Sequence, residues 1–315
     1  MNTPNLHHEK VIIGSNVFGW TLDKAASFEV LDALFEKGFR TLDTANVYSA
    51  WVDGNTGGES ETIIGEWMKS RKNRDQMTII TKVGMEVHGE KGLAKDYILR
   101  ANEASLHRLQ TEYVDVYLSH QEDTDTPIEA TLEAYQTLLD QNKVKTIGAS
   151  NYSFAGLKAS IEKAEAAGLP LYQIYQPGYN LYDREDFETQ YQHFCQTHNI
   201  AVIPYWALAS GFLTGKYRQT SDADLSQRGG GVVKKYLNPR GERILKALDE
   251  VSANTGASQA AIALAWLMAQ PTIAAPIASV TKASHIEALS TAANLELSTA
   301  HLDMLNNASA PLAIA

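Results

Sequence analysis

The sequence predicts an α/β protein, a single-domain (β/α)8 TIM barrel that spans residues 1–315. The length of 315 residues suits one large barrel. Short apolar runs alternate with stretches of helical period between residues 27 and 292, and with an opening strand they give eight strands separated by helices. Two doubly wound domains are the competing architecture. They would need a Pro/Gly linker or a composition break midway, which the sequence lacks.

The elements of the amino-terminal half follow from apolar spacing and from helix-end signals. An opening strand lies within residues 11–20, and the first helix begins at Ser27 as its cap and ends at Gly38. The helix over 59–70 carries four large apolar residues on one face, and the helix over 127–141 repeats them at i, i+4, i+7 and i+11. A further helix covers 96–109. The strands that follow the opening strand cover 39–43, 77–83, 114–120 and 144–151.

The carboxyl-terminal half continues the same rhythm. A helix over 154–168 leads to a strand over 171–177, and a helix over 184–199 leads to a strand over 200–206. A polar, glycine-rich excursion passes through residues 228–231. Two more helical stretches then lead to the last strand, 273–279, and to a last helix near residue 290.

Charge and composition exclude several classes of protein. A net charge of −10 and a pI near 5.4 argue against general affinity for nucleic acid or for acidic membrane surfaces. Cys195 is the only cysteine, which excludes an intrachain disulfide and a Cys-rich zinc site, and no other pattern suggests a metal. We find neither a signal peptide nor an apolar run of 18 residues, so we expect a cytoplasmic protein.

Polar residues stand at the carboxyl ends of the predicted strands, where the active sites of barrels lie. Asp43 ends the second strand and Tyr48 follows it, Lys82 ends the third strand, and His120 ends the fourth. A buried ammonium beside a phenol is expected to lower the phenol pKa from its usual value near ~10, while a carboxylate keeps the lysine charged. The four residues therefore predict a proton donor matched to a carbonyl that is becoming an alkoxide.

Seven short stretches occur in a fixed order along the chain: DTANVY (43–48), TK (81–82), LSH (118–120), GASN (148–151), QPGYN (176–180), YWALASGFLTGK (205–216) and PIASVTK (276–282). Together they resemble the motifs of the aldo-keto reductase superfamily, and the resemblance covers essentially the whole chain. It is strongest toward bacterial NADP(H)-dependent aldo-keto reductases whose strand-seven loop reads G-x-L-T-G-K.

This resemblance implies roles for the strand-end residues. Tyr48 would be the general acid and Lys82 its activator, with Asp43 as the partner of Lys82. His120 would orient and polarise the substrate carbonyl. The side chains expected at the substrate are Trp20, Trp51 and His120.

The resemblance also implies a nicotinamide cofactor. Three residues match positions that bind the carboxamide, an aromatic matches the one that stacks on the ring, and Ser279 and Lys282 fall where the family holds the adenosine 2′-phosphate. NADPH is therefore favoured over NADH. The residues expected at the cofactor are Ser150, Asn151, Gln173, Tyr205, Trp206, Leu208, Ser210, Gly211, Leu213, Gly215, Lys216, Ser279 and Lys282.

These observations predict an NADPH-dependent oxidoreductase that reduces an aldehyde or ketone to the alcohol. Its expected partner is a small carbonyl compound, with no nucleic acid and no membrane, and a homo-oligomer is left open. One alternative is a cofactor-sensing regulatory barrel with vestigial turnover. Another is a phosphate-binding lyase or isomerase that turns over without nicotinamide.

Overall fold

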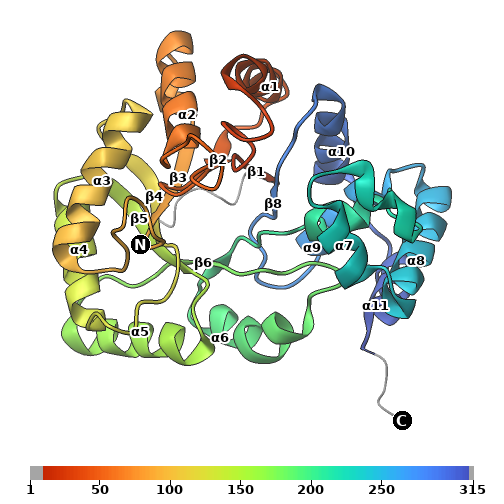
Figure 1. Cartoon of the computed structure of the whole chain (residues 1–315). Helices are drawn as coiled ribbons and strands as arrows, with labels where there is room; N and C mark the ends of the chain where they lie inside the picture. Colours follow the sequence, from red (N-terminus) through yellow and green to blue (C-terminus); the bar gives the residue numbers. More distant parts are fainter. Residues whose placement is uncertain (1–9, 312–315) are drawn as a thin grey trace.

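Eight parallel strands form the centre of the fold in the computed structural model, which describes residues 10–311. The strand order is β7-β6-β5-β4-β3-β2-β1-β8, and the helices surround the strands (Figure 1). The strands are β1 (Ile12–Gly14), β2 (Thr41–Asp43), β3 (Thr78–Val83), β4 (Val114–Ser119), β5 (Val144–Ser150), β6 (Ile174–Gln176), β7 (Ala201–Val202) and β8 (Ile277–Ala278). The predicted (β/α)8 barrel is confirmed.

The segment just before β8 closes the barrel against β7. The backbone N–H of Val202 donates to Thr272 O at 3.1 Å, and the N–H of Ala274 donates to Val202 O at 2.8 Å. The predicted strand over 273–279 is thus divided between this closing contact and the short β8, which pairs with β1.

The helices are α1 (Lys24–Glu36), α2 (Glu59–Arg71), α3 (Lys95–Leu109), α4 (Ile128–Asp140), α5 (Phe154–Ala167), α6 (Gln192–Thr197), α7 (Gly229–Tyr236), α8 (Pro239–Thr255), α9 (Gln259–Met268), α10 (Ala283–Asn294) and α11 (Thr299–Ser309). A 3-10 segment, Ala209–Thr214, follows β7. Two helices follow β8, where the sequence predicted one. Within residues 10–311, no helix combines the length and apolar character needed to cross a bilayer.

The start of α1 differs from the prediction by one turn. Asp23 caps the helix, because its carboxylate accepts a hydrogen bond from the backbone N–H of Ala26 at 2.9 Å. Ser27 is buried inside α1, and its hydroxyl donates to the carbonyl of Asp23 at 2.6 Å. The predicted Ser27 cap is therefore wrong. Both residue types suit a cap, and burial of Ser27 against the barrel decides between them.

The core has two layers. A small apolar cluster fills the inside of the barrel and includes Ile80 of β3 and Val116 of β4, while a larger cluster lies between the strands and the helices. Successive residues of a strand point to opposite faces. Since Ile80 points inward, Lys82 also points into the barrel, whereas Thr81 points outward to the helices. This alternation brings a charged side chain to the rim above an apolar filling.

Candidate active site

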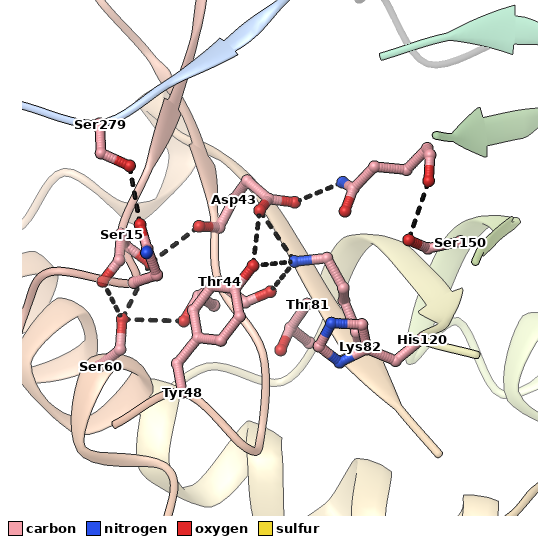
Figure 2. A network of polar contacts seen from close by, with 12 residues as sticks. Ser15, Asp43, Thr44, Tyr48, Ser60, Thr81, Lys82, His120, Ser150 and Ser279 are labelled. Atoms are coloured by element: carbon pink, nitrogen blue, oxygen red, sulfur yellow. Dashed lines mark hydrogen bonds and ion pairs between the residues drawn. The ribbon is translucent and has the colours of Figure 1, made fainter. Parts of the chain in front are cut away.

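Neighbouring strands bring the predicted polar residues to one rim. In the parallel register, Asp43 of β2 pairs with Ile80 of β3, and Lys82 pairs with Leu118 of β4. His120 directly follows β4, and its backbone N–H donates to Val83 O at 2.7 Å. The carboxyl ends of three consecutive strands therefore hold Asp43, Lys82 and His120 side by side, with Tyr48 in the loop after β2 (Figure 2).

Lys82 lies at the centre of this group. Its Nζ is 2.8 Å from Asp43 Oδ2, 2.9 Å from Tyr48 Oη and 2.7 Å from the carbonyl of Thr44. The three protons of an ammonium match these three acceptors. The Lys82 side chain is 0% exposed and that of Asp43 is 2% exposed, so the pair is buried from water. Tyr48 Oη also lies 3.3 Å from Asp43 Oδ2, and the phenol can donate there.

The pKa of Tyr48 moves opposite to the sequence expectation. Burial and the charge of nearby Asp43 raise it well above the usual value, and these effects outweigh the neighbouring ammonium. The expected lowering is therefore wrong for this site, and the phenol is protonated near neutral pH. Burial lowers the pKa of Lys82, while the charge of Asp43 acts in the opposite direction.

His120 is buried and neutral. Burial, followed by the charge of Lys82, lowers the pKa of its imidazole well below the usual value. Its ring centroid lies 6.0 Å from that of Tyr48, in an edge-on arrangement. Its Nδ1 is buried without a hydrogen-bond partner among the described residues. A neutral imidazole keeps one N–H to donate, so this ring can bind an oxygen beside the phenol.

Residues at the ends of β5 and β7 join the same rim. Ser150 Oγ donates to the carbonyl of Gln176 at 2.9 Å. Asn151 Nδ2 donates to the carbonyl of His120 at 2.8 Å, and Tyr205 Oη donates to Asn151 Oδ1 at 2.6 Å. Asn151 therefore contacts the backbone of His120, and it links Ser150 and Tyr205 to the same rim.

Gln173 does not reach this rim. It precedes β6, and its backbone N–H donates to Ile147 O at the amino end of the strand. The residue at the carboxyl end is Gln176, whose Nε2 donates to Asp43 Oδ1 at 2.8 Å. The sequence points to Gln173 instead of Gln176 because β6 is only three residues long. The proline that follows Gln176 marks the end of the strand and could have identified Gln176 as the rim residue.

The predicted cofactor residues in the loop after β7 differ in their exposure. Trp206 is 51% exposed and has a positive φ of 56°. Lys216 is exposed, whereas Leu208, Ser210, Gly211 and Gly215 are partly buried. The prediction that Leu213 binds the cofactor needs correction, since its side chain is 0% exposed and packs in the outer core. It supports the loop from below and cannot contact a ligand through its side chain.

Positive charge gathers where the chain leaves β8. Lys282 immediately precedes α10, and burial together with the charges of Lys282 and Lys216 lowers the pKa of His285. Lys216 of the loop after β7 and Lys282 of the loop after β8 therefore both lie near His285. Ser279 follows β8, and its Oγ donates to Asn16 Oδ1 in the loop after β1 at 2.7 Å.

A row of aromatic rings leads outward from Tyr48. The ring centroid of Trp51 lies 6.1 Å from that of Tyr48 and 5.6 Å from that of Trp20. The guanidinium of Arg228 lies 4.6 Å from the centroid of Trp20. Burial lowers the pKa of Arg228, and within residues 10–311 no carboxylate forms an ion pair with it. No motif of the sequence singles out this guanidinium, because Arg228 lies in the turn just before α7.

Comparison with known proteins decides the family. A model described as the aldo/keto reductase family matches residues 10–310. The chain belongs to the aldo/keto reductase family. The resemblance to the aldo-keto reductase superfamily is thereby confirmed, and the family is one of oxidoreductases. The closer likeness to bacterial members with a G-x-L-T-G-K loop stays a prediction.

Curated members of the aldo/keto reductase family align along most of their length. Aldo-keto reductase YhdN of Bacillus subtilis (strain 168) is 32% identical over 88% of this chain and 81% of its own. An aryl-alcohol dehydrogenase (NADP(+)) of Phanerodontia chrysosporium is 29% identical over 91% of this chain and 77% of its own. A probable voltage-gated potassium channel subunit beta of Arabidopsis thaliana is 28% identical over 86% and 82%.

The described residues of this aldo/keto reductase offer no cluster of three or more His, Cys, Asp or Glu side chains that could hold a metal ion. The charged and polar side chains at the rim suit an organic anion and a carbonyl group better than a metal ion. Arg228, Lys216 and Lys282 supply positive charge around the rim, and the buried Nδ1 of His120 has no hydrogen-bond partner within residues 10–311. These residues fit a phosphate-bearing nicotinamide cofactor.

Proposed function

We propose that the protein reduces an aldehyde or ketone to the alcohol, with NADPH as the hydride donor and Tyr48 as the general acid. One observation carries this proposal. Tyr48 Oη lies 2.9 Å from the buried ammonium of Lys82, and Lys82 lies 2.8 Å from Asp43. When bound, NADPH supplies the hydride, and the protein supplies orientation and the proton.

Tyr48 is suited to give a proton to the developing alkoxide. Its raised pKa keeps the phenol protonated before the reaction, so a proton is available near neutral pH. The hydrogen bond from Lys82 stabilises the phenolate that remains. Neutral His120 donates an N–H to the carbonyl oxygen and holds it near the phenol. The positive charge of Lys82 favours the same build-up of negative charge.

Two groups of residues would hold the cofactor. Ser150, Asn151 and Gln176 present polar groups at the rim for the carboxamide, and Tyr205, bonded to Asn151, offers an aromatic face. The remaining candidates, Ser279, Lys216, Lys282 and Arg228, gather hydroxyl and positive groups for the phosphates. Lys216 and Lys282 both lie near His285, and this local positive charge supports NADPH over NADH, because the 2′-phosphate adds negative charge.

Aryl aldehydes are the first substrates to test. The exposed ring of Trp51 and the neighbouring Trp20 offer an aromatic wall next to Tyr48. The relative named aryl-alcohol dehydrogenase agrees with this choice. Purified protein is incubated with NADPH or NADH and a panel of aryl and aliphatic aldehydes, and cofactor oxidation is followed at about 340 nm. Turnover with NADPH is expected, and the absence of turnover with every aldehyde would refute the proposal.

A second candidate is a cofactor-sensing subunit. The relative named as a potassium channel subunit beta motivates it. This function predicts that the protein retains NADPH through gel filtration but oxidises it no faster with aldehydes than without them. The same panel therefore separates the two functions. Turnover without any nicotinamide would instead indicate a lyase or isomerase.

A further inference from the structure

The first turn of α2 contacts three strands below the catalytic rim. Ser60 and Glu61 are both fully buried there. Ser60 Oγ lies 2.8 Å from Ser15 Oγ after β1, and it accepts a hydrogen bond from Thr44 Oγ1 after β2 at 3.0 Å (Figure 2). Ser15 Oγ in turn donates to the carbonyl of Asp43 at 2.8 Å. The backbone that carries Asp43 is thus tied to α2.

Glu61 makes the corresponding contact with β3. Its Oε1 accepts a hydrogen bond from Thr81 Oγ1 at 2.5 Å, and its Oε2 accepts one from Arg108 Nε of α3 at 2.7 Å. Thr81 is the outward-facing neighbour of Lys82. Any rotation of β3 that moved Lys82 away from Tyr48 would therefore stretch the contact between Thr81 and Glu61.

Close packing holds Glu61 in place. A Cβ on Gly65 would lie 2.2 Å from the carbonyl oxygen of Arg108, and a Cβ on Gly58 would lie 2.4 Å from the side chain of Arg108. These two glycines let α2 approach α3 closely enough for Arg108 to reach Glu61. A buried carboxylate with both oxygens bonded has little freedom to move.

The charges around Lys82 come from both sides of the strand. Inside the barrel Lys82 faces Asp43, the phenol of Tyr48 and His120, while Glu61 lies behind β3 with Arg108 as its counter-ion. The phenol of Tyr117 on β4 lies close enough to Glu61 for this carboxylate to help raise the tyrosine pKa, after burial as the main cause. Burial lowers the pKa of Lys82, and the charges of Asp43 and Glu61 oppose that effect.

We propose that Glu61 is a positioning residue for Lys82. Through Thr81 it fixes the end of β3, and its negative charge helps to keep the ammonium protonated next to Tyr48. This inference rests on the proposed reductase function. If the role of Glu61 were purely structural, this residue would only link α2 to α3 and would not affect the protonation of Lys82.

The test compares Glu61→Gln with Asp115→Asn as a matched control. Asp115 is also a nearly buried carboxylate bonded to β3, because it accepts from the N–H of Ile79 and from Arg74 Nη2, both at 2.9 Å. It acts near the amino end of the strand, away from the rim. We measure kcat with NADPH and an aldehyde from pH 6 to 10, the NADPH dissociation constant, and the unfolding midpoint.

For Glu61→Gln we expect kcat at neutral pH to fall by about tenfold or more, because small displacements at a reacting centre are costly. We also expect the alkaline limb of kcat to move to lower pH, with the NADPH dissociation constant unchanged within about twofold. Asp115→Asn should be less stable than wild type, but its kcat should decline at the same alkaline pH as that of wild type. An unmoved limb in Glu61→Gln, or an equal shift in Asp115→Asn, overturns the inference.

Variants of Thr81 keep the test decisive if Glu61→Gln does not fold. Thr81→Ser retains the hydroxyl that Glu61 accepts, whereas Thr81→Val removes it at similar volume. The serine variant is expected to keep kcat and the valine variant to lower it, and equal kcat values overturn the inference. A wild type that oxidises no NADPH refutes the proposed function and this inference together. A fully active wild type with unaffected variants refutes only the inference.

Discussion

Removal of Asp43 tests the electrostatics of the buried centre. Asp43→Ala leaves the ammonium of Lys82 in a site where it is 0% exposed, without its partner at 2.8 Å. Breaking such a pair costs about 3–5 kcal/mol. Lys82 can limit the cost by losing its proton, which at pH 7 requires about 5 kcal/mol for a group with a usual pKa near 10.4. We therefore expect Asp43→Ala to lower the unfolding free energy by about 3–5 kcal/mol at pH 7.

The pH dependence of this loss follows from the same reasoning. In Asp43→Ala the folded-state pKa of Lys82 falls well below that of the unfolded chain, so the unfolded chain binds the extra proton. Stability then rises with pH up to the unfolded pKa, and the gap to wild type narrows by up to about 1.4 kcal/mol per pH unit. Urea denaturation at pH 7 and pH 9 measures the gap.

The double variant Asp43→Ala/Lys82→Met is the control for the Asp43 experiment. It buries no unpaired charge, so most of the lost stability should return and the remaining loss should not vary with pH. Activity should stay absent. Losses that simply add in the double variant, or a gap that is equal at pH 7 and pH 9, would refute the coupling of Asp43 to Lys82.

Three further predictions address other parts of the molecule. Because the pKa of His120 is lowered in the folded state, this group should cost wild type up to about 1.4 kcal/mol of stability per pH unit below pH ~6.5. The loss measured in urea titrations should be smaller in His120→Gln, in which His285 still contributes to it. Gly65→Ala should cost about 1–3 kcal/mol, since its Cβ would lie 2.2 Å from the backbone oxygen of Arg108, and an unchanged denaturation midpoint would contradict that packing. Lys282→Ala should weaken NADPH binding by about tenfold in fluorescence titrations, equivalent to about 1.4 kcal/mol, while NADH binding stays the same. Equal weakening of both cofactors would argue against a 2′-phosphate contact.

The fold and the four strand-end residues could be predicted from the sequence because both follow from local order. Alternating apolar runs set the barrel, and parallel strands necessarily bring their carboxyl ends to one rim. Asp43 ends β2, Lys82 is the last residue but one of β3, and His120 follows β4, so their proximity needs no long-range detail.

Features that depend on packing could not be predicted in the same way. Gln176 and Gln173 differ only in their position relative to a three-residue strand. The burial of Leu213 and the contact of Arg228 with Trp20 arise from loops without regular spacing. The direction in which the pKa of Tyr48 shifts depends on the balance between burial, Asp43 and Lys82, and this balance follows only from the three-dimensional structure.

The rate of NADPH oxidation by the Tyr48→Phe variant is the most direct test of the proposed mechanism. The variant removes only the phenolic hydroxyl that lies 2.9 Å from Lys82. In single-turnover experiments with NADPH and a reactive aldehyde, we expect the rate of NADPH oxidation to fall by about 10²–10⁴-fold. The NADPH dissociation constant should stay within about twofold of wild type. A Tyr48→Phe variant that oxidises NADPH at the wild-type rate would contradict the role of this phenol as the proton donor.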